Sequence, residues 1–389
     1  MKKTNRKNII LSSLLVMALA LIASFSTNIK ADTVTTAPWL YKEIHKTPGT
    51  TTPAVTFTYE FTAVSFNNDT SDLSFVPVIN DMTLSFSSTD NTDSNATTTN
   101  IIEVKKGLAI SLPSTYDRAG EYVYTVVESS NDFTPGANDS LTDSDAKYEI
   151  HVFVKNNASG VEIEGVTVYQ LLNDAGTTDG VSSAKIEADQ AGEALKFIST
   201  YSKTATLSVY KEVVGDYANK KKEFTFVVNF AAAGNVTGSN SYSYYISENG
   251  TKVPGSDTAY TINGTGSVTV QLTHNQAAVF EGLPTGTKFY AIENKDTKYT
   301  SKGEISSNGV VTSNISQTDT SGNLLLNATA NENADTLIGE GINYAKAINT
   351  ENNISVTGVI FDNLPFLILI VIGATGVGYY IIKRKRAFQ

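Results

Sequence analysis

Short runs in which apolar and polar residues alternate fill the middle of the chain and predict β-strands. The clearest runs are Val55–Phe61, Tyr122–Val126, Tyr148–Val154 and Phe224–Val228, and clusters of Asn, Gly and Asp separate such runs from one another. Alternation with a period of two is typical of strands that bury one face. No helical period of comparable length occurs between the two apolar ends of the chain. The pattern therefore predicts an all-β protein built of β-sandwiches.

An internal repeat divides this β-rich region into two parts. The segment Leu40–Ile44 recurs as Val209–Val213, 169 residues later, and Phe57 recurs as Phe226 at the same offset. Roughly 320 residues remain between the two apolar ends, which is too long for one sandwich and suits two domains. We predict two tandem copies of one β-sandwich module, at residues 32–203 and 204–350.

Both ends of the chain carry signals for export and membrane retention. Basic residues precede the apolar run Ile9–Ala23, and the small residue Ala31 follows it, which indicates a secretory signal peptide over residues 1–31. At the other end, the uncharged 19-residue run Leu364–Ile382 is long enough to cross a bilayer as a helix. The basic cluster Lys383–Arg386 would stay on the cytoplasmic side.

Composition narrows the classes of function. The net charge of −10 and the pI near 4.9 argue against nucleic acid as a partner. The chain has no cysteine, which excludes cysteine-nucleophile chemistry. The three histidines, His45, His151 and His274, are widely spaced and show neither a catalytic dyad nor a metal-binding motif. We therefore expect no metal, no cofactor and no enzymatic activity toward a substrate, and a wall-bound hydrolase is disfavoured.

Two charged residues of the second module fall on strand faces that point to the core. Lys211 alternates with valines, and Glu293 alternates with Phe289 and Ala291. Burial shifts both groups toward their neutral forms, so that lysine becomes a nucleophile and glutamic acid a hydrogen-bond donor. If an asparagine carboxamide lies between them, the amine can attack it and form an isopeptide bond with loss of ammonia.

The closing strand near residues 342–345 is expected to supply that asparagine. Asn343 is the first choice and Asn349 the second. The alternative is a buried polar cluster without a bond.

Two motifs resemble known families. Phe280–Glu293 looks like the signature of collagen-adhesin B-type domains, which are immunoglobulin-like sandwiches with self-formed Lys–Asn bonds. Ile354–Gly358, followed by the apolar run and the basic tail, resembles the cell-wall sorting signal of Gram-positive surface proteins. Two such modules between these ends resemble the major backbone pilins of streptococci, of the T-antigen type.

The resemblance implies a set of further residues and partners. A sortase would cut between Thr357 and Gly358 and pass the threonine acyl group to an amine of the next pilin subunit or of peptidoglycan. Ile-Ser-Val stands where Leu-Pro or Val-Pro usually precedes the threonine, so the motif does not specify which sortase accepts it. The acceptor lysine would be Lys185, with Lys196 as the alternative. An ordinary membrane anchor that is never cut is the competing interpretation.

By analogy, the first module should hold Lys42, Glu128 and an acceptor at Ser199. Serine has no carboxamide, so this module is expected to keep a buried pair without the bond. Our leading hypothesis is a covalently assembled pilus shaft protein on the cell surface. The alternative is a monomeric wall-anchored adhesin or accessory pilin that binds a host ligand.

Overall fold

The structure is a computed structural model that describes residues 37–90, 101–182, 184–186, 195–333 and 336–352, with scattered residues between 366 and 383. The predicted signal peptide and the pair Thr357 and Gly358 lie outside the described residues. What is described between residues 37 and 352 is built of strands, which confirms the predicted all-β class. The four alternating runs named above all fall within strands.

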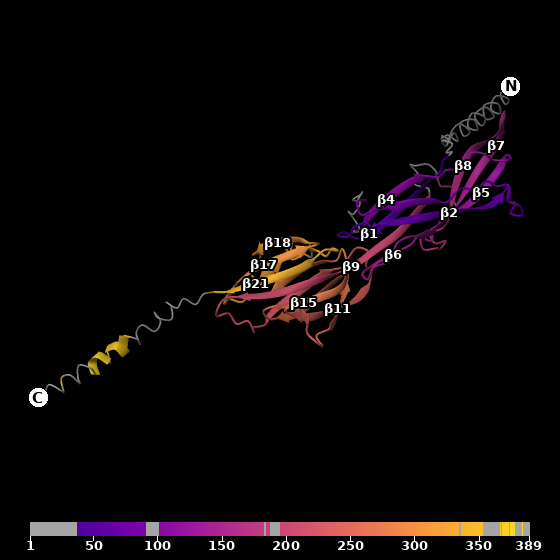
Figure 1. The fold of residues 1–389 in the computed structure, drawn as a ribbon. Coiled ribbons are helices and arrows are strands. Elements are labelled where there is room, and N and C mark those ends of the chain that lie inside the picture. The colour runs from indigo at the N-terminus through magenta and orange to yellow at the C-terminus, as the bar shows by residue number, and fades with distance from the viewer. Residues whose placement is uncertain are drawn as a thin grey trace, which may run out of the picture. The chain divides into compact units, whose positions relative to one another are not determined.

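Contacts divide the described chain into two compact units that meet in the sequence at Tyr201 and Ser202, with Thr47–Thr50 grouped with the second. The predicted boundary was 203/204. The ribbon of Figure 1 shows the strands of each unit.

The first unit is a sandwich of two sheets. One sheet has the order β3-β2-β5-β7-β8, and in the other β1 pairs with β4 and β9, and β6 pairs with β9. Its strands are β1 (Trp39–Lys46), β2 (Val55–Phe66), β3 (Met82–Phe86), β4 (Ile102–Ala109), β5 (Gly120–Asn131), β6 (Asp139–Thr142), β7 (Lys147–Asn157), β8 (Gly160–Leu172) and the first part of β9 (Leu195–Val214).

The second unit has the strand path β18-β17-β21-β9-β15-β11-β13-β14-β10-β16-β19, with β12 beside β11 and β20 beside β16. Only the β9 and β21 pair is parallel among the described pairs of this path. Its further strands are β10 (Phe224–Ala231), β11 (Ser239–Glu248), β12 (Thr251–Lys252), β13 (Thr258–Asn263), β14 (Thr265–Leu272), β15 (Gln276–Pro284), β16 (Lys288–Glu293), β17 (Tyr299–Ser307), β18 (Val310–Ile315), β19 (Leu324–Leu326), β20 (Thr336–Leu337) and β21 (Asn343–Glu351).

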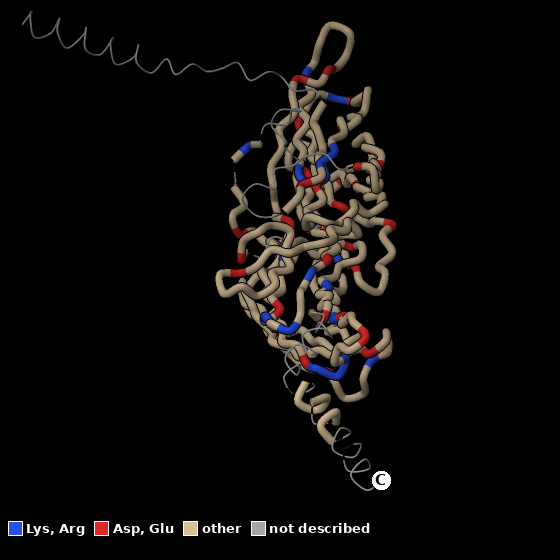
Figure 2. The backbone as a smooth tube through the Cα atoms, turned by 90° about the vertical axis from the view of Figure 1, so that its left-hand side faces the viewer, with Lys and Arg blue, Asp and Glu red and all other residues tan. Residues whose placement is uncertain are grey.

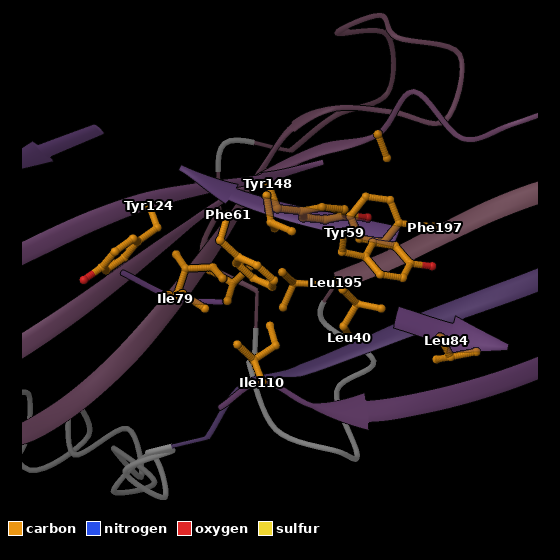
Figure 3. Packing of buried hydrophobic residues seen from close by; sticks show 14 of the residues in the cluster. Leu40, Tyr59, Phe61, Ile79, Leu84, Ile110, Tyr124, Tyr148, Leu195 and Phe197 are labelled. Atoms are coloured by element: carbon orange, nitrogen blue, oxygen red, sulfur yellow. The ribbon is translucent and has the colours of Figure 1, made fainter. Parts of the chain in front are cut away.

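Aromatic rings fill the core of the first unit close to β9. Phe197 lies with its ring centroid 5.0 Å from that of Tyr59 and 5.3 Å from that of Tyr148, and Figure 3 shows these side chains grouped together. Each ring comes from a different strand, and all three are buried. The packing holds β9 against β2 and β7, because aromatic side chains contribute large buried areas and favour tilted contacts.

Residues of both charge signs are distributed along the chain. Figure 2 shows lysine and arginine interspersed with aspartate and glutamate along the described tube, although acidic residues outnumber basic ones, 39 to 29. Within the described residues, no helix has the length and hydropathy needed to span a membrane. Much of the run Leu364–Ile382 lies outside them, so the membrane helix stays a prediction.

Candidate cross-link sites

Strand parity brings Lys211 and Glu293 into the core of the second unit. On β9, residues 207, 209, 211 and 213 are buried while their neighbours are more exposed, and on β16 residues 289, 291 and 293 are buried in the same way. Lys211 and Glu293 are each only 1% exposed. The inward orientation predicted from the sequence for both charged residues is the one that the structure shows.

The two side chains meet an asparagine of the closing strand. Lys211 Nζ donates to Glu293 Oε1 at 2.6 Å, and Asn349 Nδ2 donates to the same oxygen at 2.9 Å. Asn349 is 0% exposed. Glu293 Oε2 and Asn349 Oδ1 have no hydrogen-bond partner among the described residues. One carboxylate oxygen thus contacts both the amine and the carboxamide nitrogen.

The apolar surroundings favour the neutral forms of the pair. Burial lowers the pKa of Lys211 to about 8, against the opposing effect of Glu293, and the ammonium nitrogen lies 4.2 Å from the ring centroid of Phe224. Burial likewise raises the pKa of Glu293, although Lys211 partly offsets it. A buried amine and acid that approach neutrality together are suited to nucleophilic attack with proton transfer.

Asn343, the first choice from the sequence, does not join this pair. Its carboxamide is fully used elsewhere: Oδ1 accepts from the backbone N–H groups of Asn308 and Gly339, and Nδ2 donates to the carbonyls of Gly339, Gly341 and Thr206. It stands six residues before Asn349 on β21, which is about 20 Å along a strand. The structure therefore brings the second choice, Asn349, to Lys211 and Glu293 instead.

The first unit contains an equivalent cluster with a serine. Lys42 Nζ contacts Glu128 Oε2 at 2.5 Å and Ser199 Oγ at 2.5 Å. Lys42 and Ser199 are both 0% exposed, and the lysine nitrogen lies 4.0 Å from the ring centroid of Phe57. Burial lowers the pKa of Lys42 and raises that of Glu128. The three residues named from the sequence for this module lie together.

Strand register shows that the serine and the asparagine occupy the same position. In the first unit Lys42 is opposite Phe197 in the parallel β1 and β9 pair, and Ser199 is two residues further on. In the second unit Lys211 is opposite Ala347 in the parallel β9 and β21 pair, and Asn349 is again two residues further on. The two clusters therefore differ in the chemistry of one side chain rather than in strand geometry.

The structure gives His45 carboxylate neighbours that its sequence spacing did not reveal. Its Nε2 lies 3.3 Å from Glu43 Oε2 and 3.9 Å from Glu103 Oε1, and these three residues could together hold a metal ion. Two lysine ammonium groups, of Lys105 and Lys196, lie 3.9 and 3.5 Å from Glu43 Oε1. The lysines therefore already offset the charge of the buried Glu43 carboxylate.

The two candidate acceptor lysines differ in their surroundings. Lys196 lies within β9, where its side chain reaches Glu43 and its backbone contacts the Tyr148 hydroxyl. Lys185 is exposed and precedes Ile186, whose N–H donates to the Val168 carbonyl of β8 at 2.8 Å. A surface pocket of about 470 Å³ is lined in part by Ser182, which precedes Lys185 by three residues, and by residues of β7 and β8.

Comparisons with known proteins found one family model and several solved structures that are similar to this chain. Residues 205–329 match a family described as a domain of unknown function, DUF7601. No curated protein matches the chain. The chain is similar to the crystal structure of the major pilin from Streptococcus pyogenes, at 18% identity and a TM-score of 0.34, over 82% of this chain and 99% of that one.

Two further solved structures show a similar likeness. The major pilin T3.2 from Streptococcus pyogenes has 15% identity and a TM-score of 0.33, over 82% of this chain and 99% of that one. A pilus-presented adhesin has 14% identity and a TM-score of 0.27, over 50% of this chain and 39% of that one.

Proposed function

We propose that this protein is the structural subunit of a covalently assembled surface pilus, stabilised by a self-formed isopeptide bond between Lys211 and Asn349. The observation that carries the proposal is the buried arrangement in which Glu293 Oε1 contacts both Lys211 Nζ and Asn349 Nδ2. A lysine, a glutamate and an asparagine with almost no solvent exposure have the groups needed for amide exchange.

The reaction follows from those contacts. Neutral Lys211 Nζ attacks the side-chain carbonyl carbon of Asn349, whose carboxamide Glu293 holds in place through Nδ2. Glu293 then takes a proton from the attacking nitrogen and gives one to Nδ2, because its Oε1 lies within hydrogen-bond distance of both. The bond between carbon and Nδ2 breaks, ammonia leaves, and one amide replaces another. The protein acts once on itself and turns over no substrate.

The bond would join the first and last strands of the second unit. The residues between Lys211 and Asn349 form a closed loop of well over 100 residues. By the chain-entropy estimate used for disulfides, such a loop stabilises the folded state by roughly 4 to 5 kcal/mol. In a subunit that transmits force along a fibre, a covalent bond between the first and last strands keeps these strands from separating.

Mass spectrometry tests the bond directly. The mature wild-type protein should be lighter by one ammonia than its sequence mass, and digestion should yield one branched peptide that contains Lys211 and Asn349. Glu293→Gln should retain the ammonia. Asn343→Ala is the matched control and should still lose it, since its contacts lie elsewhere. Recovery of residues 211 and 349 as separate, unmodified peptides would disprove the bond.

Assembly is supported by the sorting signal and by the position of Lys185. We infer that a sortase cuts between Thr357 and Gly358 and joins the new threonine carboxyl group to Lys185 of the next subunit, or to peptidoglycan at the base. Cell-wall extracts boiled in detergent should show a regular high-mass ladder on an immunoblot. Lys185→Arg should abolish the ladder and Lys196→Arg should keep it. A single band in the wild type would instead indicate a monomeric wall-anchored adhesin.

A further inference from the structure

One strand belongs to both units. β9 runs without interruption from Leu195 to Val214, and the boundary between the units falls inside it, at Tyr201 and Ser202. In the first unit β9 is the last strand and pairs in parallel with β1. In the second unit it is the first strand and pairs in parallel with β21, which closes the unit at Glu351. The covalent backbone of a single strand thus connects the two folds.

This topology determines where tension passes. We propose that load on the assembled fibre enters at Lys185, follows the backbone into β9 and on to Lys211, crosses the covalent bond to Asn349 and leaves through the end of β21, so that strands β1 to β8 of the first unit carry no load. The inference rests on the proposed function, which supplies the acceptor lysine and the bond. If Lys196 is the acceptor, the route is the same, because Lys196 is already part of β9.

Strands β1 to β8 of the first unit lie outside this route because of chain order. Strands β1 to β8 all precede Lys185, so none of their residues stands between the two points of attachment. β1 and β6 pair with β9 from the side, and β8 contacts the route through the hydrogen bond between Val168 and Ile186. A strand held at both ends transmits tension through its own peptide bonds. The chain from Lys185 to Leu195 can span roughly 35 Å at most.

The second unit does lie on the route. Without a bond, load would have to pass from β9 to β21 through the hydrogen bonds of eight residue pairs, from Leu207 with Asn343 to Val214 with Thr350. With the bond, the chain between residues 211 and 349 is bypassed. A cross-link is therefore mechanically required in the second unit and not in the first. Ser199, which cannot form the bond, is consistent with this difference between the units. A bond from Lys42 would link β9 only to β1, which carries no load.

Single-molecule pulling can test the route, because the chain has no cysteine of its own. Mature protein with Ala37→Cys and Asn352→Cys is pulled through the first unit, and protein with Lys185→Cys and Asn352→Cys is pulled along the proposed route. The first pair should show an unfolding step on the order of 500 Å, from the release of residues up to β9. The second pair should show no step beyond roughly 35 Å. Adding Lys211→Arg to the second pair should produce a step on the order of 450 Å.

Fibres taken from cells provide the decisive comparison. Wild-type fibres should stretch without 500 Å steps, and Ser199→Asn fibres should behave like wild type, even if that substitution abolishes the step in the 37 to 352 pull. Repeated steps of that size in wild-type fibres would overturn the route while leaving the proposed function intact. The route would also be overturned if the Lys185→Cys and Asn352→Cys protein, with Lys211 intact and its ammonia lost, showed a large unfolding step. An extract without a ladder, or a mature mass without the ammonia loss, would overturn the proposed function and the route with it.

Discussion

The two buried clusters are the same in place and different in chemistry. Each has a lysine on the first strand of its unit, a glutamate on another strand and a third polar residue two positions beyond the lysine's partner on the parallel closing strand. The third residue is Ser199 in one and Asn349 in the other. A serine hydroxyl can satisfy the lysine by hydrogen bonding, but it has no acyl carbon that an amine can attack.

By the proposed mechanism, burial of a lysine and glutamate pair does not by itself produce a cross-link. Lys42 is as deeply buried as Lys211, and its pKa is lowered for the same reason, which is desolvation. The second unit differs because Asn349 supplies an electrophilic carboxamide, which contacts the Glu293 carboxylate. Each unit can therefore be converted into the other by one substitution.

The largest effect is expected from converting the second unit into the first. Asn349→Ser should remove the electrophile, leave the ammonia loss undetectable and lower the free energy of unfolding of the second unit by roughly 4 to 5 kcal/mol, because the loop constraint disappears. Guanidinium denaturation of the mature protein followed by circular dichroism measures this. The single tryptophan, Trp39, lies in β1, so its fluorescence serves as an internal control for the unchanged first unit. If Asn349→Ser left the unfolding transition of the second unit unchanged, the asparagine would form no stabilising bond.

The next effect is a dependence on pH that only the unlinked second unit should have. In Asn349→Ser the Lys211 amine is free, and its pKa is about 8 in the fold against an ordinary value of 10.5. Between these values the unfolded chain binds the proton more tightly than the folded unit does, so stability should rise with pH by about 3 kcal/mol.

In the linked protein the same nitrogen is an amide and does not titrate. Denaturation midpoints of the second unit at pH 7.5 and pH 10, compared between Asn349→Ser and wild type, measure the difference. Parallel pH profiles in the two proteins would contradict the assignment of Lys211 as the reacting amine.

The smallest expected effect comes from converting the first unit into the second. Ser199→Asn should place a carboxamide beside Lys42 and Glu128 and cause the loss of one further ammonia. The new tie should contribute roughly 4 to 5 kcal/mol, offset by about 1 to 3 kcal/mol for inserting a larger side chain into a packed site, which leaves a gain of about 2 kcal/mol.

Trp39 fluorescence during denaturation reports this gain, because the tryptophan belongs to the first unit. Ser199→Ala is the matched control and should lose no second ammonia but should lose stability, since Lys42 then loses one hydrogen-bond partner. A folded Ser199→Asn protein that loses only the one ammonia of the second unit would show that the first cluster lacks the geometry for the reaction.

Much of both clusters could be predicted from the sequence, because the strand period of two places every second side chain on the same face. Alternation with valine, phenylalanine and alanine was enough to predict that Lys211 and Glu293 point inward. The 169-residue repeat and the residues around Ser199 likewise identified the cluster of the first unit. These are local properties of each strand and need no knowledge of how strands pair.

The tertiary structure decided which asparagine faces the lysine. Asn343 and Asn349 stand an even number of residues apart on β21, so alternation puts both on the same buried face and cannot separate them. Their distance from Lys211 depends on the parallel register of β21 against β9, which sets Ala347 opposite the lysine. The same pairing makes β9 a shared strand. Register and strand sharing arise from contacts between segments far apart in the chain, and no pattern within one segment encodes them.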